Sequence, residues 1–195
     1  ELAPLLDQHR DWGEGHHLRG RALSVLRRWE PAAKALSQAS QLLPGRPDVW
    51  DHLGNAFDAI EDFLEASRAY DHSLALNPGW HASWNNAADA AINTQRFDHA
   101  YQYALMALTL APDNGTCLLN FARACQGRKD FSRARQALSV LIGVDPHHPQ
   151  AEQEFGVLCL EIGDHDEAKA HFDRASAIAP DDLAIHGSLI FLNNY

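Results

Sequence analysis

Residues 47–80 read PDVWDHLGNAFDAIEDFLEASRAYDHSLALNPGW, and this stretch decides the fold. Trp50, Leu53, Gly54 and Phe57 recur at spacings of three and four residues, so they share one face of a helix. A second helical run follows and ends at Pro78, which lacks an N–H group and cannot continue a helix. The stretch therefore predicts two helices joined by a short turn.

The same pattern occurs five times between Gly13 and Asp182 without an insertion or a deletion. With windows beginning at residues 13, 47, 81, 115 and 149, the twentieth position is always alanine and the thirty-second is always proline. These residues are Ala32, Ala66, Ala100, Ala134 and Ala168, and Pro44, Pro78, Pro112, Pro146 and Pro180. The chain has only nine prolines, so five in strict phase indicate a helical repeat array.

Two further positions show how the helices of each pair are expected to pack. Position 8 holds a small residue every time, as two closely packed helices require: Gly20, Gly54, Ala88, Ala122 and Gly156. Position 17 is aromatic in four repeats, where it can cover the hairpin: Trp29, Phe63, Phe97 and Phe131. These residues resemble the consensus of the tetratricopeptide repeat (TPR) family. The resemblance implies an all-α, right-handed TPR superhelix that works as a scaffold for protein–protein interaction.

The expected organisation follows from the period. Five repeats occupy residues 13–46, 47–80, 81–114, 115–148 and 149–182. Residues 1–12 are expected to form an N-terminal cap or extension, and residues 183–195 a C-terminal capping helix. The run from Leu189 to Leu192 is apolar around the whole circumference of that helix, so it needs cover on more than one side. We therefore expect a chain cut from a longer protein, or a homodimer contact through this helix.

Residues 186–195, HGSLIFLNNY, carry a second resemblance. They look like the segment that joins TPR arrays to the catalytic domains of bacterial proteins similar to O-linked N-acetylglucosamine transferases. The matching residues include His186, Leu189, Phe191 and Tyr195. If this resemblance holds, the chain is the non-catalytic substrate-recognition arm of a larger protein glycosyltransferase, or of another transferase. This reading is the alternative to a free-standing scaffold.

Composition excludes several other functions. The net charge of −10 argues against nucleic acid as a partner, because phosphate binding favours a basic surface. No apolar run is long enough for membrane insertion. Catalytic motifs and cofactor-binding loops are absent from the sequence, and neither a His-x-x-x-His pair nor HExxH predicts a metal site. We therefore expect no enzyme activity in this chain, no cofactor and no metal, in a cytoplasmic bacterial protein.

The family assigns the first helix of each repeat to the concave groove. The groove residues that we expect to bind a ligand are Asp48, Asp51, Asn55, Asp58, Asn85, Asn86, Asp89, Asn93, Asn120 and Arg123. Asparagine amides can donate and accept at once, which suits the backbone of an extended peptide. The aspartates add a preference for lysine or arginine. The sequence thus predicts a groove for an extended, neutral-to-basic peptide of an unidentified protein, with a merely solvated helix face as the alternative.

The three cysteines have no CxxC spacing. Cys125 and Cys159 both occupy position 11, which the repeat buries. We expect them to be core residues in a reducing compartment, with a regulatory disulfide between them as the alternative.

Overall fold

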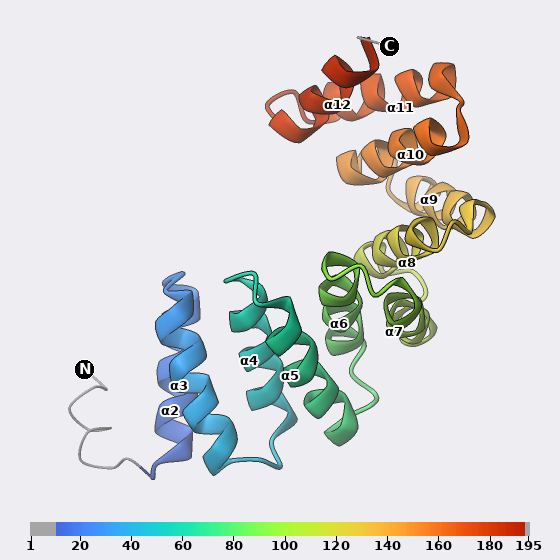
Figure 1. Cartoon of the computed structure of the whole chain (residues 1–195). Helices are drawn as coiled ribbons and strands as arrows, with labels where there is room; N and C mark the ends of the chain where they lie inside the picture. The colour runs from blue at the N-terminus through green and yellow to red at the C-terminus, as the bar shows by residue number, and fades with distance from the viewer. Residues whose placement is uncertain (1–10, 194–195) are drawn as a thin grey trace. The chain divides into compact units, whose positions relative to one another are not determined.

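The computed structural model describes residues 11–193, and every regular element within that range is a helix. The predicted all-α fold is confirmed. The eleven helices are α2 (Gly13–Val25), α3 (Trp29–Leu42), α4 (Pro47–Asp58), α5 (Phe63–Leu76), α6 (His81–Asn93), α7 (Phe97–Leu110), α8 (Gly115–Gly127), α9 (Phe131–Val144), α10 (Pro149–Ile162), α11 (His165–Ile178) and α12 (Leu183–Asn193) (Figure 1). None of the helices in this described part is long and apolar enough to cross a bilayer.

The turn inside each helix pair has the same backbone conformation throughout. Position 15 has a positive φ in every repeat, although only the last one is glycine: Arg27, Glu61, Gln95, Lys129 and Gly163. In the second repeat the N–H of Asp62 donates to the carbonyl of Phe57 over 2.9 Å, as in a Schellman motif. Asp62 then caps α5 by accepting from the N–H of Glu65. This turn fixes where the second helix begins.

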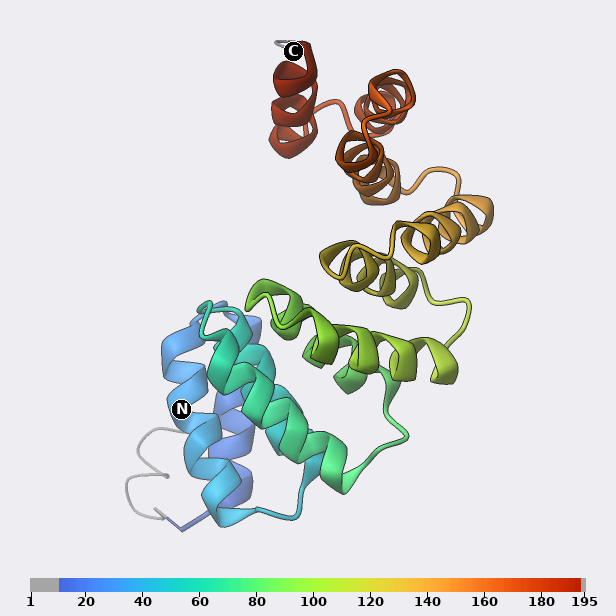
Figure 2. The same cartoon turned by 45° about the vertical axis from the view of Figure 1, so that its right-hand side comes forward.

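The chain forms two compact units, which we describe separately. The first ends at Arg96 and contains α2 to α6; the second begins at Phe97 and contains α7 to α12. Neighbouring helices pair within each unit, for example α2 with α3 and α10 with α11 (Figures 1 and 2). In the first unit α4 contacts both α2 and α6, so first helices of consecutive repeats are neighbours.

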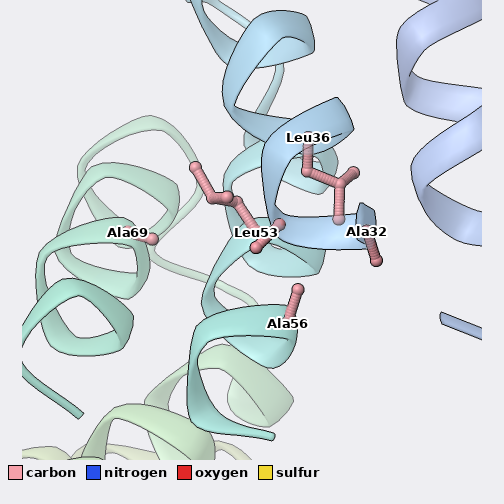
Figure 3. Packing of buried hydrophobic residues seen from close by; sticks show 6 residues of the cluster. Ala32, Leu36, Leu53, Ala56 and Ala69 are labelled. Carbon is pink, nitrogen blue, oxygen red and sulfur yellow. The ribbon is translucent and has the colours of Figure 1, made fainter. Parts of the chain in front are cut away.

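Small side chains allow this close packing. The alanine at position 20 is fully buried in all five repeats: Ala32, Ala66, Ala100, Ala134 and Ala168. Around α3, α4 and α5, Leu36 and Leu53 interlock with alanines to form a core cluster (Figure 3). Glycine at position 8 makes room for a large residue on the paired helix. A Cβ on Gly54 would lie 2.5 Å from the Tyr70 ring, and one on Gly156 would lie 2.7 Å from Phe172.

The aromatic residue at position 17 packs farther along the array than the sequence suggests. A Cβ on Gly127 would lie only 2.0 Å from the Phe97 ring. Gly127 ends α8, the first helix of the following repeat, so Phe97 covers that helix as well as its own turn. This position therefore links neighbouring repeats within the second unit.

Candidate functional site

A polar network joins α4 and α6 in the first unit. Asp51 of α4 is only 6% exposed, and its Oδ1 accepts a hydrogen bond from the Ser83 hydroxyl of α6 over 2.5 Å. Its Oδ2 accepts from the Asn55 amide over 3.4 Å. Burial raises the pKa of Asp51, and the hydrogen bond from Ser83 opposes that rise. Both carboxylate oxygens are thus engaged within the protein, so Asp51 organises the network rather than offering a ligand contact.

Asn55 is the centre of this network. Its Oδ1 accepts from the Tyr70 hydroxyl over 2.9 Å and from the Asn86 amide over 3.0 Å. Tyr70 comes from α5 and is 1% exposed, and burial raises its pKa. Because Asn55 also donates to Asp51, its amide is held by three neighbours. Asn86 differs, because within the described part of the chain only its amide nitrogen is engaged, by Asn55. Its carbonyl oxygen can therefore accept a hydrogen bond from a ligand.

Two more predicted carboxylates lie next to this network. Asp58, the last residue of α4, is half-buried, and its Oδ1 has no hydrogen-bond partner among the described residues. Burial, and then the charge of Asp89 on α6, raise the pKa of Asp58 to about 6. Asp89 itself accepts from the Asn93 amide over 3.3 Å. A site with two neighbouring carboxylates and an unsatisfied oxygen favours a cationic group.

Asp48 belongs to a different group of charges. Arg46 makes two hydrogen bonds to its carboxylate, of 2.8 and 2.6 Å, and also pairs with Glu14 of α2 over 2.6 Å. The hydrogen bond from Arg46 lowers the pKa of Asp48. Its carboxylate is therefore already engaged by Arg46, which it shares with Glu14.

Two histidines also meet between α2 and α4. The Nε2 of His17 lies 2.9 Å from the Nδ1 of His52. Burial, and then the charge of His52, lower the pKa of His17, and burial lowers that of His52. One ring therefore donates to the other, and the two imidazoles carry little charge at neutral pH.

The second unit contains the remaining predicted residues. Asn120 of α8 is 7% exposed and accepts from Arg123 over 3.4 Å. Arg123 also pairs with Glu154 of α10, with an Nε–Oε1 distance of 3.4 Å. Burial raises the pKa of Glu154, and the Arg123 charge opposes that rise. The basic residue that interrupts the predicted acidic groove is thus paired inside its own unit.

The structure therefore brings only some of the predicted site residues together. It brings Asp51, Asn55 and Asn86 into one network, and it places Asp58 within electrostatic reach of Asp89. Of the other α6 residues on the predicted list, Asn85 is half-buried and Asn93 is exposed. Asp48 is engaged elsewhere by Arg46, and Asn120 and Arg123 belong to the other unit.

Sequence reasoning missed Tyr70 and Ser83, which hold this network in place. A signal was present for Ser83. It occupies position 3, where the other repeats have the small or apolar residues Gly15, Val49, Cys117 and Ala151. A hydroxyl at a position that the fold buries needs a hydrogen-bond partner nearby, and Asp51 is that partner.

All three cysteines are buried free thiols. Burial raises the pKa of Cys125 to about 11, so its thiolate is scarce at neutral pH. This state agrees with the core role that the sequence suggests for Cys125.

Comparison with known proteins identifies the repeat. Two family models described as tetratricopeptide repeat match the chain, one over residues 128–189 and the other over residues 81–114. Among curated proteins, anaphase-promoting complex subunit 3 of Schizosaccharomyces pombe is 22% identical over 163 residues. That match covers 84% of this chain and 24% of the relative, so this chain spans about a quarter of that protein.

Solved structures agree on the fold. YrrB, described as a TPR protein with an unusual peptide-binding site, has a TM-score of 0.76 and 16% identity. The match covers 96% of this chain and 97% of YrrB. MamA from Desulfovibrio magneticus RS-1 has a TM-score of 0.77 and 17% identity, with 88% of this chain and 97% of that chain covered. At these identities the likeness shows the fold alone.

Proposed function

The chain is a tetratricopeptide repeat protein, and from that premise we propose that its first unit binds an extended, neutral-to-basic peptide segment of another protein. TPR proteins in general bind other proteins or peptides, which supports an interaction scaffold rather than an enzyme. The proposed contact surface is the polar face of α4 and α6, defined by Asn55, Asp58, Asn86 and Asp89. We call this surface the α4–α6 face.

The unsatisfied oxygen of Asp58 is the observation that carries the proposal. A half-buried carboxylate with one oxygen that lacks a donor among the described residues, near a second carboxylate, is unfavourable in the free protein. A lysine or arginine side chain placed between Asp58 and Asp89 would offset the repulsion between the two charges, and rotation of the Asp58 carboxylate would bring its enclosed Oδ1 to that cation. The α4–α6 face is therefore matched to a cation.

Asn86 supplies the second element of recognition. Its amide nitrogen donates to Asn55, which orients the side chain and leaves its carbonyl oxygen available within the described residues. That oxygen can accept a backbone N–H of a peptide, whatever the side chain of that residue. Asp51 and Tyr70 fix Asn55 in turn, so the amide pair is held in place before a ligand arrives.

Retention of peptides by the whole protein tests this proposal. Two pools of end-blocked peptides are compared, one with a fixed central lysine and the other with a fixed central glutamate, and both with randomised flanking positions. The wild-type chain should retain the lysine pool and release it as salt rises. The double variant Asp58→Asn/Asp89→Asn should lose this retention.

Asp11→Asn serves as the matched control, because it removes one exposed carboxylate of the first unit outside the α4–α6 face. That variant should retain the lysine pool as the wild type does. Equal retention of the two pools by the wild type would contradict the proposal, as would unchanged retention by the double variant.

The alternative reading, a recognition arm of a larger glycosyltransferase, rests on the sequence of residues 186–195. The side chains of Phe191 and Tyr195, which help to carry that resemblance, lie outside the described residues. A homodimer contact through residues 183–195 also remains a prediction from sequence. Sedimentation equilibrium of the whole chain would test the dimer, because a monomer at all concentrations would contradict it.

A further inference from the structure

Three potential metal ligands converge between α10 and α11 in the second unit. Cys159 comes from α10, and Glu167 and His171 come from α11. One ligand atom from each lies within 4.8 Å of the other two. Cys159 is fully buried and His171 is 6% exposed, whereas about a third of the Glu167 side chain (35%) is exposed. The cluster is therefore protected by the core and open to solvent on the Glu167 side.

The separations are close to those of a tetrahedral site. The Cys159 sulfur lies 3.4 Å from Glu167 Oε2, and His171 Nε2 lies 4.0 Å from Glu167 Oε1. Zinc bonds of about 2.0–2.3 Å place neighbouring ligand atoms about 3.3–3.7 Å apart in tetrahedral geometry. The ligand atoms of the cluster are at most 4.8 Å apart, so no two of them have to move closer by more than about 1.5 Å to reach that geometry.

Glu152 orients the histidine ring. This residue of α10 is 3% exposed, and its Oε2 lies 2.6 Å from His171 Nδ1. Glu152 can only accept and the nearby Arg174 Nη2 can only donate, so these two neighbours favour opposite tautomers of His171. In the tautomer that donates to Glu152 the proton is on Nδ1, and the lone pair of Nε2 is left for a ligand. The ring is also stacked on Phe155, with centroids 4.0 Å apart and planes at 11°. A metal-binding histidine usually donates its other N–H to a carboxylate in this way.

Arginines surround both carboxylates. Arg174 Nε lies 3.1 Å from the same Glu152 oxygen, and Nη2 of Arg174 is 2.7 Å from His171 Nδ1. Arg135 makes two hydrogen bonds to Glu167, of 2.9 and 2.8 Å. A metal ion must therefore displace Arg135 from at least one Glu167 oxygen before it binds.

The repeat itself does not require this cluster. The corresponding positions of the preceding repeat hold Cys125, Arg133 and Ala137, and the position of Glu152 holds Leu118. The position of Glu152 has tryptophan in two other repeats, so a buried acid there departs from the repeat pattern. Burying such an acid is costly unless its partners compensate, and here the partners are the histidine of the cluster and Arg174.

We propose that Cys159, Glu167 and His171 bind a divalent metal ion of the zinc type, with Glu152 as the positioning residue for His171. A sulfur, a nitrogen and an oxygen ligand suit Zn²⁺, and the fourth position would hold water or a ligand atom. On binding, the Cys159 thiol releases its proton to solvent and its sulfur bonds to the metal, with no change of oxidation state. This site is independent of the α4–α6 face.

Titration of the whole chain with Co²⁺ tests the proposal, because a thiolate–Co²⁺ bond gives a charge-transfer band in the near ultraviolet. The wild type should show this band and lose it when Zn²⁺ is added. Cys159→Ser should abolish it, whereas Cys125→Ser, which changes a buried cysteine at the same repeat position, should retain it. Glu152→Gln should weaken Co²⁺ binding about tenfold or more.

One further variant distinguishes a metal-binding site from a cluster whose side chains only stabilise the fold. Arg135→Gln keeps all three ligands and removes the competing cation, so it should tighten Co²⁺ binding on the order of tenfold. This variant also decides the case if Cys159→Ser fails to fold by circular dichroism. A wild type without the band would overturn the proposal. So would a band that persists in folded Cys159→Ser, or an unchanged or weaker affinity in Arg135→Gln.

Discussion

Replacing Asp58 by asparagine should stabilise the first unit at neutral pH. The pKa of Asp58 is raised from 3.8 to about 6 in the folded chain by burial and by Asp89. A difference of about 2 in pKa corresponds to about 3 kcal/mol against the ionised folded form, since each pKa unit is about 1.4 kcal/mol. The side chain is half-buried and partly screened by solvent, so we expect Asp58→Asn to raise the free energy of unfolding by about 1–2 kcal/mol at pH 7.

The sign of the pH dependence follows from the same shift. Between pH 3.8 and about 6 the folded chain keeps the Asp58 proton while the unfolded chain has lost it. The contribution of Asp58 to stability is therefore most favourable below the unfolded pKa and falls as pH rises through this window. Above pH 6 Asp58 is ionised in both the folded and the unfolded chain, so its destabilising effect has reached its full size. The stabilisation by Asp58→Asn should thus be near zero at pH 4 and should reach its full value at pH 7.

Urea denaturation of the wild type and Asp58→Asn at both pH values measures this difference, because other titrating groups cancel between the two chains. Asp11→Asn controls for the loss of one exposed negative charge and should change the free energy of unfolding by less than about 0.5 kcal/mol. Destabilisation by Asp58→Asn at pH 7, or an equal effect at pH 4 and pH 7, would refute the reasoning. The stabilised variant should also retain less of the lysine peptide pool.

Four other substitutions test the fold by denaturation. Gly163→Ala should lower the free energy of unfolding by about 1 kcal/mol, because Gly163 has a φ of 86°. Gly143→Ala inside α9 should raise it by up to about 1 kcal/mol. The same sign for both substitutions would contradict the turn geometry. Ser83→Ala should cost about 1–3 kcal/mol by removing a donor from buried Asp51, and a neutral result would mean that water replaces it. Ile185→Ala should cost about 2–4 kcal/mol, because Ile185 is fully buried on α12; no loss would mean that this helix does not cap the second unit.

The repeat could be read from the sequence because its defining residues act within one helix pair. Alanine at position 20 and a small residue at position 8 meet a constraint that recurs every period, so each appears in every repeat. The five second helices accordingly begin 34 residues apart, from Trp29 to His165. The left-handed turn at position 15 was not readable, because Arg27, Glu61, Gln95 and Lys129 share no side-chain property that favours a positive φ, and only Gly163 signals the conformation.

The candidate sites were less readable because they depend on contacts that occur once. Asp51 was expected to face a ligand, yet Ser83 from the next repeat engages it. Glu152 and His171 form a pair across two helices that no local motif describes. Ser83 does stand out as a hydroxyl at a position that the other repeats leave small or apolar, and Glu152 as the acid at a position that otherwise holds histidine, tryptophan or leucine. Such departures from the repeat are the signal that sequence reasoning can use.

Mapping a bound peptide by NMR tests the central claim most directly. A peptide recovered from the lysine pool is titrated into the isotopically labelled chain, and the amide signals of the backbone and of the asparagine side chains are followed. We expect the largest shifts at the side chain of Asn86 and at the backbone of Asp58 and Asp89. Shifts confined to the second unit or to α3 and α5, or no shifts at saturating peptide, would contradict binding at the α4–α6 face.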